Sequence, residues 1–309
     1  MDLIFCGTPA FAVPTLEALA SAGHRIHLVV TQPDRPKGRG LELVASPVKQ
    51  SAQKLNLPIT QPDKIKTNDE FLAQLTALRP DAIIVVGYGR IIPQRMLDLP
   101  PLGNINLHAS LLPKYRGAAP IQWAIANGET VTGVTTMRLD AGLDTGDILL
   151  QKQLPIAPDD TSETLAPPLA KIGADLIVET LTALQAGTIH PRKQDNAQAT
   201  LAPILKKEDG LIDFTRSAVE ILNRLRGFQP WPGAYTKFRG KNLQILKARL
   251  ANEAVPPAAI GAKVDCLIVG CGQNSSLEIE ELQLEGKKRT IAQDFLHGYR
   301  PKPGEKLGA

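Results

Sequence analysis

Two polar side chains with complementary chemistry lie two residues apart in a short stretch where polar and apolar residues alternate. Asn106 and His108 belong to the segment Asn104–His108, whose residues are typical of a short strand. Because alternate side chains of a strand point to the same face, we expect the amide and the imidazole side by side. Asp144 lies farther along, in the loop 139–147 rich in Gly and Asp, which can bring a carboxylate next to the strand end.

These three groups are the ones that acyl transfer to an amine requires. The oxygen of the attacked carbonyl becomes negatively charged and needs hydrogen-bond donors. Histidine moves protons well near neutral pH, and a carboxylate holds it in one tautomer and stabilises its cation. No Ser or Cys nucleophile is needed when the amine attacks directly. We therefore predict Asn106, His108 and Asp144 as catalytic residues.

Each residue also has a plainer interpretation when taken alone. A single His on a strand is more often a structural residue than a catalytic one. The loop around Asp144 could be a simple turn, and it lacks the ligand order of a calcium loop. The residues by themselves therefore suggest this chemistry without establishing it.

The first half of the chain alternates apolar strands with helical patterns. Ser46 followed by Pro47 is a typical start of a helix. Strands are expected at Leu3–Gly7, Ile26–Thr31, Ala82–Gly87 and Asn104–His108. This alternation predicts a doubly wound, Rossmann-like α/β domain with a mostly parallel sheet, whose sites lie at the carboxyl ends of the strands.

The last third has a different pattern. A polar stretch at 190–205 is interpreted as a linker, so we predict a catalytic domain at 1–189 and a second domain at 206–309. After a helix at Ala218–Phe228, strands are expected at Leu243–Leu250, Ala262–Val269 and Leu277–Leu284, with a kink or bulge in the last. Short strands separated by turns predict a small OB-like β-barrel, an architecture that often binds oligonucleotides.

The charge is unevenly distributed between these parts. Residues 206–309 hold 17 Lys and Arg against 12 Asp and Glu, whereas residues 1–205 hold 18 against 19. A basic surface favours an anionic partner such as RNA, although a solvated face would have the same composition.

Other classes of protein fit poorly. The sequence has no apolar run of the ~20 residues that a membrane helix needs, and we see no secretory signal. Its three cysteines form no CxxC pair, and none of its five histidines has metal-ligand spacing, so we expect no metal site. No GxGxxG fingerprint indicates a nicotinamide cofactor.

The segment Asn106–Pro113 and the loop at Asp144 resemble the active site of the folate-dependent formyltransferase family, in its branch that acts on methionyl-tRNA. The shared pattern is N-x-H, then S-L-L-P, then a distant D-x-G-D. Further similar segments are Phe5–Pro9, Thr31–Pro36, Gly38–Gly40, Ser46–Lys49, Lys114–Gln122, Lys207–Asp213 and Phe228–Tyr235. The resemblance covers nearly the whole chain.

The resemblance implies a donor, an acceptor and three roles. The co-substrate would be 10-formyltetrahydrofolate, and the acceptor would be the α-amine of initiator methionyl-tRNA. Asn106 would bind the formyl oxygen and its oxyanion. His108 would stabilise that charge and pass a proton to the departing folate nitrogen. Asp144 would orient His108 and help to take the proton from the amine.

The resemblance also implies binding residues. The folate pocket would be lined by Ser110, Leu111, Leu112 and Pro113. The tRNA would be contacted by Arg35, Lys37 and Arg39 in the loop 34–44 and by Lys206 and Lys207 in the second domain. We expect a bacterial-type cytoplasmic monomer without a membrane segment.

Other functions remain open from the sequence alone. A formyltransferase for a small amine, or a formylfolate hydrolase, would use the same catalytic residues. A non-catalytic RNA-binding protein would keep only the basic second domain, and His108→Ala would then leave its function intact.

Overall fold

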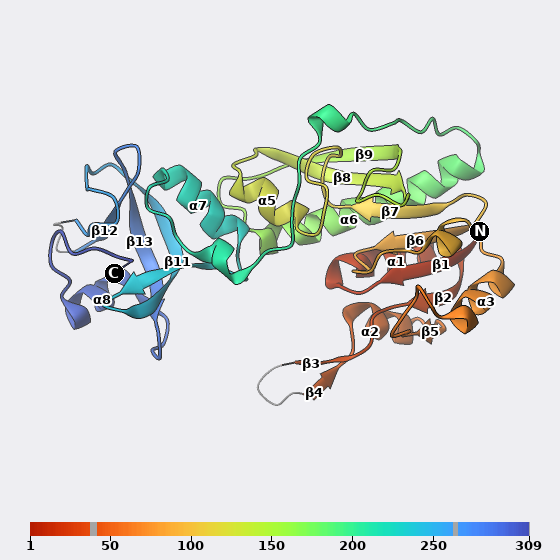
Figure 1. The fold of residues 1–309 in the computed structure, drawn as a ribbon, viewed down its shortest axis with the longest axis horizontal. Coiled ribbons are helices and arrows are strands. Elements are labelled where there is room, and N and C mark those ends of the chain that lie inside the picture. Colours follow the sequence, from red (N-terminus) through yellow and green to blue (C-terminus); the bar gives the residue numbers. More distant parts are fainter. Residues whose placement is uncertain (38–41, 262–264, 309) are drawn as a thin grey trace. The chain divides into compact units, whose positions relative to one another are not determined.

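The computed structural model describes residues 1–37, 42–261 and 265–308 of the 309-residue chain. Figure 1 shows the helices and strands, which belong to two units. Unit 1 comprises Met1–Pro120, Val131–Pro155 and Ala166–Pro203, and unit 2 comprises Ile121–Thr130, Ile156–Leu165 and Ile204–Ala309. In the described residues, no helix has both the length and the apolar character needed to span a bilayer.

A seven-stranded sheet in the order β5-β2-β1-β6-β7-β8-β9 forms the centre of unit 1. The first five strands in this order are parallel to one another, β8 pairs antiparallel with β7, and β9 pairs antiparallel with β8. The strands are β1 (Asp2–Gly7), β2 (Arg25–Val30), β5 (Ile59–Thr60), β6 (Ala82–Val86), β7 (Asn104–His108), β8 (Val131–Arg138) and β9 (Ile148–Pro155). The prediction of a mostly parallel, Rossmann-like sheet is confirmed.

Helices connect these strands, and a short hairpin projects from them. The hairpin consists of β3 (Arg35–Lys37) and β4 (Glu42–Val44). The helices are α1 (Val13–Ser21), α2 (Pro47–Lys54), α3 (Asp69–Leu78), α4 (Gln94–Leu97), α5 (Pro120–Ala126) and α6 (Ser162–Gln185). Ser46 is the N-cap of α2, as predicted, because its hydroxyl accepts a hydrogen bond of 3.1 Å from the Lys49 amide.

The two faces of the sheet are covered differently near β7. On one face, side chains of β1, β2 and β6 pack against α3 and against Met96 of α4. On the other face, α6 lies so close that a Cβ on Gly173 would be 2.6 Å from the Leu107 side chain. Since β7 alternates, Leu107 faces α6, whereas Asn104, Asn106 and His108 share the opposite face.

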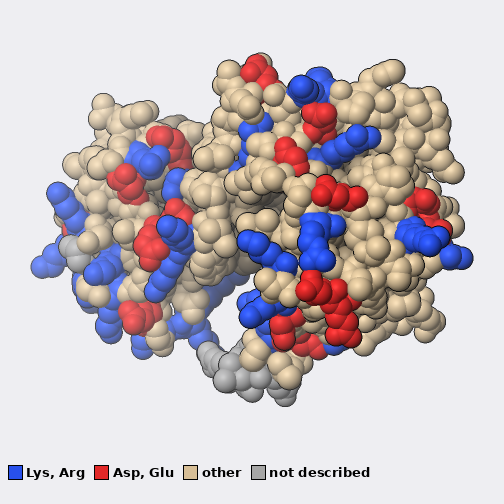
Figure 2. Space-filling view, turned by 45° about the vertical axis from the view of Figure 1, so that its right-hand side comes forward, with Lys and Arg blue, Asp and Glu red and all other residues tan. Residues whose placement is uncertain are grey.

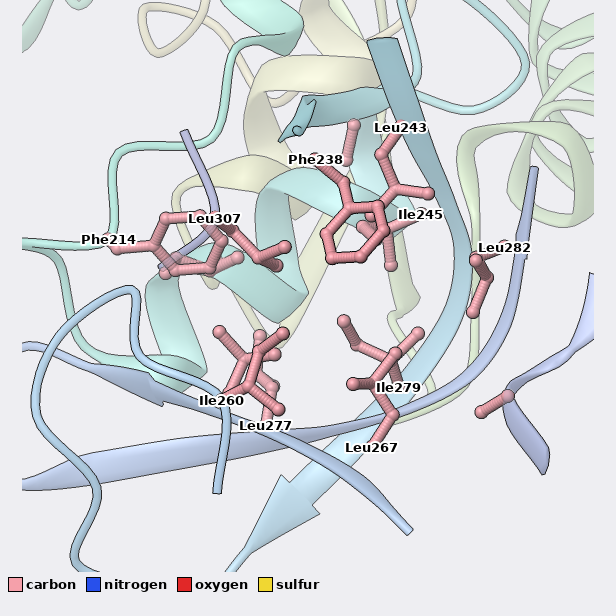
Figure 3. Packing of buried hydrophobic residues seen from close by; sticks show 14 of the residues in the cluster. Phe214, Phe238, Leu243, Ile245, Ile260, Leu267, Leu277, Ile279, Leu282 and Leu307 are labelled. Carbon is pink, nitrogen blue, oxygen red and sulfur yellow. The ribbon is translucent and has the colours of Figure 1, made fainter. Parts of the chain in front are cut away.

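Unit 2 is built on an antiparallel, curled sheet in the order β10-β11-β13-β12, with β14 beside β13. Its elements are α7 (Ala218–Gly227), β10 (Ala234–Phe238), β11 (Lys241–Ala251), β12 (Leu267–Cys271), β13 (Ser275–Leu284), β14 (Thr290–Ile291) and α8 (Ala292–Tyr299). The sheet curls around an apolar core that includes Phe214, Phe238 and Leu267 (Figure 3). The fold class predicted for this part of the chain is confirmed.

The bulge predicted in the segment 277–284 is present in the pairing of β11 with β13. Leu282 pairs with Ile245 and Ile279 pairs with Ala248, and the register shifts between these pairs. The shift lets Ile279 and Leu282 both point into the core although they are three residues apart. The strand expected at Ala262–Val269 begins at Leu267, and residues 262–264 lie outside the described residues.

Candidate active site

The polar face of β7 carries two amides in different situations. Asn104 is 1% exposed, and its Nδ2 donates to the carbonyls of Met96 and Leu97 at 3.1 and 3.0 Å. Asn106, the next residue on this face, is 8% exposed, and no described protein group hydrogen-bonds its side chain. A buried amide normally has partners, so Asn104 serves the fold and Asn106 is free to bind something else.

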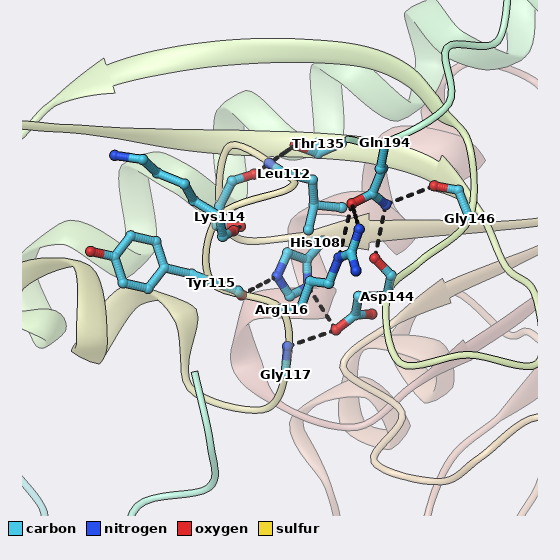
Figure 4. Close-up of polar contacts among 11 residues, drawn as sticks. His108, Leu112, Lys114, Tyr115, Arg116, Gly117, Thr135, Asp144, Gly146 and Gln194 are labelled. Carbon is cyan, nitrogen blue, oxygen red and sulfur yellow. Dashed lines mark hydrogen bonds and ion pairs between the residues drawn. The ribbon is translucent and has the colours of Figure 1, made fainter. Parts of the chain in front are cut away.

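His108 ends β7 with both ring nitrogens engaged (Figure 4). Nε2 lies 2.8 Å from the Tyr115 carbonyl oxygen, which can only accept, so Nε2 carries a proton and donates it. Nδ1 lies 3.6 Å from Oδ2 of Asp144. A second proton on this ring would therefore sit on Nδ1, next to a carboxylate that stabilises the resulting cation.

Asp144 reaches His108 along an indirect path. Because β8 runs antiparallel to β7, with Arg138 beside Ile105, the loop 139–147 begins at the amino end of β7. His108 lies at the other end of the strand, about 13 Å away at ~3.3 Å per residue. The loop must fold back along β7, and Asp144 adopts a left-handed φ of 51° there. The Gly117 amide then donates to Asp144 Oδ2 at 2.9 Å.

The structure thus brings two of the three predicted catalytic residues into contact and places the third on the same strand face. His108 and Asp144 are 6% and 14% exposed at their side chains. Asn106 offers an amide N–H on the same face, two positions before His108. Together they provide an oxyanion donor, a proton carrier and a carboxylate, which suits acyl transfer to an amine.

The predicted folate segment 110–113 is held by hydrogen bonds to the neighbouring strands β8 and β9. Thr135 Oγ1 donates to the Ser110 carbonyl at 2.6 Å and accepts from the Leu112 amide at 3.1 Å. Gln151 Nε2 donates to the Leu112 carbonyl at 2.9 Å. Leu111 packs against Gly133, where a Cβ would lie 2.6 Å from it, and Pro113 follows a cis peptide bond. This network fixes the shape of the segment beside His108.

The cysteines offer no nucleophile to this site. Cys6 and Cys271 are buried, and Cys266 is partly exposed; all three are free thiols. Burial raises the pKa of the Cys271 thiol to about 11 and raises that of Cys6 further. Such thiols stay protonated near neutral pH and are poor nucleophiles. Over the described ranges, no group of three or more His, Cys, Asp and Glu is arranged to hold a metal ion.

The described residues predicted for tRNA binding belong to both units. Arg35 and Lys37 belong to β3, and Arg35 Nη2 donates to Gln32 at 3.1 Å. Arg39 lies outside the described residues. Lys206 and Lys207 are exposed at the start of a 3-10 turn, and Glu208 and Asp209 follow them directly. The charge at this turn is therefore balanced.

The positive excess of the last third gathers elsewhere, at one end of the unit 2 sheet. We call this the basic end; it comprises nine cations (Lys237, Arg239, Lys241, Lys287, Lys288, Arg289, Arg300, Lys302, Lys306) and four carboxylates (Glu281, Glu285, Asp294, Glu305). The rest of 206–309 holds eight residues of each sign. Figure 2 shows such a gathering of blue side chains at the lower left of the molecule.

Hydrogen bonds join the segments of the basic end. The Asn242 amide donates to Glu285 and the Glu285 amide donates back to the Asn242 carbonyl, at 3.0 and 2.8 Å. Arg239 donates to Glu305 at 2.7 Å and to the Tyr299 carbonyl at 3.1 Å. The turns after β10 and β13, the end of α8 and the C-terminal segment therefore form one continuous surface.

Several residues that build the site were missed in the sequence. Tyr115 and Gly117 act through a backbone carbonyl and a backbone amide, for which no residue type is a signal. Arg116 and Gln194, which are 78 positions apart in the chain, support the Asp144 loop together. Arg116 and Gly117 were visible only as part of a segment with family resemblance.

Comparison with known proteins agrees with this geometry. Residues 1–181 match the family model "Formyl transferase", and residues 204–300 match "Formyl transferase, C-terminal domain". A methionyl-tRNA formyltransferase of Koribacter versatilis is 67% identical over 308 residues, covering 100% of this chain and 99% of the relative. The methionyl-tRNA formyltransferase of Acidobacterium capsulatum is 62% identical over 311 residues, with 100% of both chains covered.

Solved structures share the fold at low identity. A sugar 3N-formyltransferase crystallised with dTDP and 5-N-formyl-THF has a TM-score of 0.65 at 21% identity, covering 93% of this chain and 99% of that one. An N-formyltransferase of Helicobacter canadensis, in complex with folinic acid and dTDP-3-aminofucose, has a TM-score of 0.64 at 19% identity, covering 90% and 98%. By its two matched domains and its full-length relatives, the chain belongs to the formyl transferase family, among the methionyl-tRNA formyltransferases.

Proposed function

We propose that this chain transfers the formyl group of 10-formyltetrahydrofolate to the free α-amino group of initiator methionyl-tRNA, as a step in translation initiation. One observation carries the proposal. Asn106, His108 and Asp144 supply the groups for acyl transfer in a chain that is 67% identical, over its full length, to a methionyl-tRNA formyltransferase. A formyltransferase for a small amine and a non-catalytic RNA-binding protein fit this identity less well.

The three residues stabilise the negative charge that develops on the formyl oxygen and move the protons of the reaction. The formyl group supplies an electrophilic carbonyl carbon, and Asn106 donates a hydrogen bond to its oxygen as negative charge develops. Nδ1 of His108 holds a proton next to Asp144 and stabilises that charge, while Nε2 stays on the Tyr115 carbonyl. As the bond between the formyl carbon and the folate nitrogen breaks, Nδ1 passes its proton to that departing nitrogen. Asp144 orients the ring, stabilises its cation and helps to accept the proton of the amine, which replaces the proton that Nδ1 has given up.

The folate fits this face of β7 for a physical reason. The Asn106 side chain is buried without a protein partner, and a carbonyl oxygen is the acceptor that its N–H group lacks. We propose that Ser110, Leu111, Leu112 and Pro113 contribute a fixed wall beside this acceptor. Most of their carbonyls are already hydrogen-bonded within the protein, which favours apolar contact over backbone recognition.

The tRNA is proposed to bind two parts of the chain. Arg35, Lys37 and Arg39 of the segment 34–44 would contact it near the reacting end, and residues 206–309 would hold its backbone. Within 206–309, the basic end offers more uncompensated charge than Lys206 and Lys207 do. Lys287 and Lys288 make no ion pair with any described residue and line a shallow pocket with Thr290 and Tyr299.

Reversing two charges at the basic end is expected to weaken the use of tRNA. Lys287→Glu with Lys288→Glu should raise the KM for methionyl-tRNA about 10-fold or more and leave the KM for 10-formyltetrahydrofolate unchanged, because phosphate contacts position RNA without touching the donor. The slope of log(kcat/KM) against log[salt] should become shallower by about one for each lost phosphate contact.

The matched control reverses a charge elsewhere in unit 2. Arg249 is 62% exposed and pairs with Glu278 at 2.8 Å, farther along β11 and outside the basic end. Arg249→Glu should change the KM for methionyl-tRNA by less than about twofold. Because the control reverses one charge and the double variant reverses two, a loss in the control that is half as large on a logarithmic scale would mean that net charge, and not the basic end, decides tRNA binding.

The central experiment mixes purified protein, 10-formyltetrahydrofolate and methionyl-tRNA. Labelled formyl-methionyl-tRNA should form with initiator tRNA and much less with elongator tRNA. Its absence would reject the proposed function, and formylation of a small amine in its place would favour the sister activity. We also propose that the protein works as a monomer, because a single chain supplies all three catalytic residues, and light scattering at assay concentration tests this. We further propose that it is located in the bacterial cytoplasm.

A further inference from the structure

The Asp144 loop needs support from outside itself. Asp144 has a φ of 51°, a conformation that costs a non-glycine residue free energy unless its surroundings hold it. Inside the loop, Asp140 accepts hydrogen bonds from the Gly142 amide and the Thr145 hydroxyl, at 3.0 and 2.7 Å. These contacts shape the turn but do not attach it over His108.

One side chain from the polar segment after α6 makes that attachment. Gln194 Nε2 donates to the Asp144 carbonyl at 2.8 Å and to the Gly146 carbonyl at 2.7 Å (Figure 4). Both protons of the amide are thus used on the two carbonyls that flank Thr145. Each hydrogen bond joins residues about 50 positions apart, so the segment carrying Gln194 is part of the framework of unit 1.

The orientation of this amide is fixed by a buried cation. Nε and Nη2 of Arg116 donate to Gln194 Oε1 at 3.0 and 2.8 Å, and Nη2 also donates to Asn196 Oδ1 at 2.9 Å. Arg116 is 7% exposed. A guanidinium has donors only, so it selects the oxygen of Gln194 and turns the nitrogen toward the Asp144 loop.

The residue after Arg116 contacts Asp144 directly. The Gly117 amide, directly after Arg116, donates to Asp144 Oδ2 at 2.9 Å, the oxygen that faces His108. A Cβ on Gly117 would lie 2.6 Å from the Ala202 carbonyl, so this approach requires glycine. Arg116–Gly117 therefore fixes both the carboxylate and, through Gln194, the main chain of Asp144.

We propose that Gln194, oriented by Arg116, is a positioning residue that keeps the Asp144 carboxylate facing Nδ1 of His108. This inference rests on the proposed formyl transfer and adds a residue to it. Gln194 touches no reacting atom in this arrangement. Its removal should leave substrate binding in place and reduce the fraction of molecules in which the Asp144 carboxylate faces Nδ1.

The test is a split between kcat and KM. Gln194→Ala should lower kcat by about 10–100-fold, the usual range for a residue that orients a site group through hydrogen bonds, with both KM values within about twofold. Gln194→Glu should lose at least as much, because its carboxylate still accepts from Arg116 but has no N–H for the two carbonyls. Asn196→Ala removes the other partner of Arg116 and should keep kcat within about threefold.

Coupling to Asp144 separates positioning from general stability. In an Asp144→Asn background, Gln194→Ala should lower kcat less than about twofold further, because residues that act as a unit are not additive. Full additivity, or an equal kcat loss in Asn196→Ala, would overturn the proposal.

A second readout does not depend on activity. The Gly117 amide hydrogen should exchange faster in Gln194→Ala than in Asn196→Ala, because the Asp144 acceptor is released. Unchanged protection would reject the positioning role even if the formylation assay failed. Conversely, changed protection without any formylation by the unmodified protein would reject the proposed function but support the positioning role of Gln194.

Discussion

Asn106→Ala is expected to lower kcat by about 10²–10³-fold while binding of 10-formyltetrahydrofolate stays within a few-fold. The reason is that the Asn106 amide is buried and has no protein partner, so its hydrogen bond is free to strengthen as charge develops on the formyl oxygen. Removing one oxyanion donor typically costs about 3–4 kcal/mol in the transition state and much less in the ground state. Single-turnover formylation and equilibrium folate binding measure the two effects separately.

Two variants make this test specific. Asn106→Asp keeps the shape but replaces the donor with a negative charge, so its kcat should fall below that of Asn106→Ala. Asn104→Ala removes a neighbouring amide that bonds only to Met96 and Leu97. It should lower the melting temperature and leave kcat within about threefold. If Asn106→Ala weakened folate binding by as much as it slowed the reaction, the amide would be a binding group and not an oxyanion donor.

The strand that carries the site was predictable because its signal is local. An apolar run with polar residues at every second position requires only the two-residue period of a strand to place Asn106 and His108 on one face. The start of α2 after its N-cap Ser46 and the register shift in β13 likewise follow from the types of a few adjacent residues. Such features depend on neighbours in sequence, and the structure confirms them.

The path of the Asp144 loop was not predictable in the same way. Neither the strand before the loop, β8, nor its direction in the sheet is predicted from the sequence. Antiparallel pairing of β8 places the loop at the far end of β7, so a supporting residue is needed to bring it back. That residue, Gln194, lies in a polar segment whose composition is also typical of a linker. Only long-range contacts distinguish a segment that supports the site from a linker between domains.

The sign of the charge was predictable, but its location was not. Counting residues gives the excess in 206–309. It does not show that Lys206 and Lys207 are balanced by Glu208 and Asp209. It also does not show that two turns join at the basic end through Asn242 and Glu285, which are 43 positions apart. Charge location follows from the register of β11 and β13, which only the folded chain determines.

His108→Ala is expected to lower kcat by about 10³-fold, within the range of 10²–10⁴ that proton transfer by a positioned side chain contributes. The His108 ring is held at Nε2 by the Tyr115 carbonyl and faces Asp144 at Nδ1, so it is the group on this face that can carry a proton to the reacting atoms. Because His108 and Asp144 act as a pair, adding Asp144→Asn to His108→Ala should cost less than about threefold more.

The chain provides its own control for this pair. His27 on β2 also lies beside a carboxylate, with Nε2 2.9 Å from Oδ1 of Asp2, and it is remote from β7 in the order of the sheet. His27→Ala breaks a His–Asp contact of shorter distance, yet it should leave kcat unchanged within about twofold. Steady-state formylation of methionyl-tRNA by these three variants measures the three effects. Equal losses from His27→Ala and His108→Ala would mean that both act through the stability of unit 1, and the catalytic assignment of His108 would then be wrong.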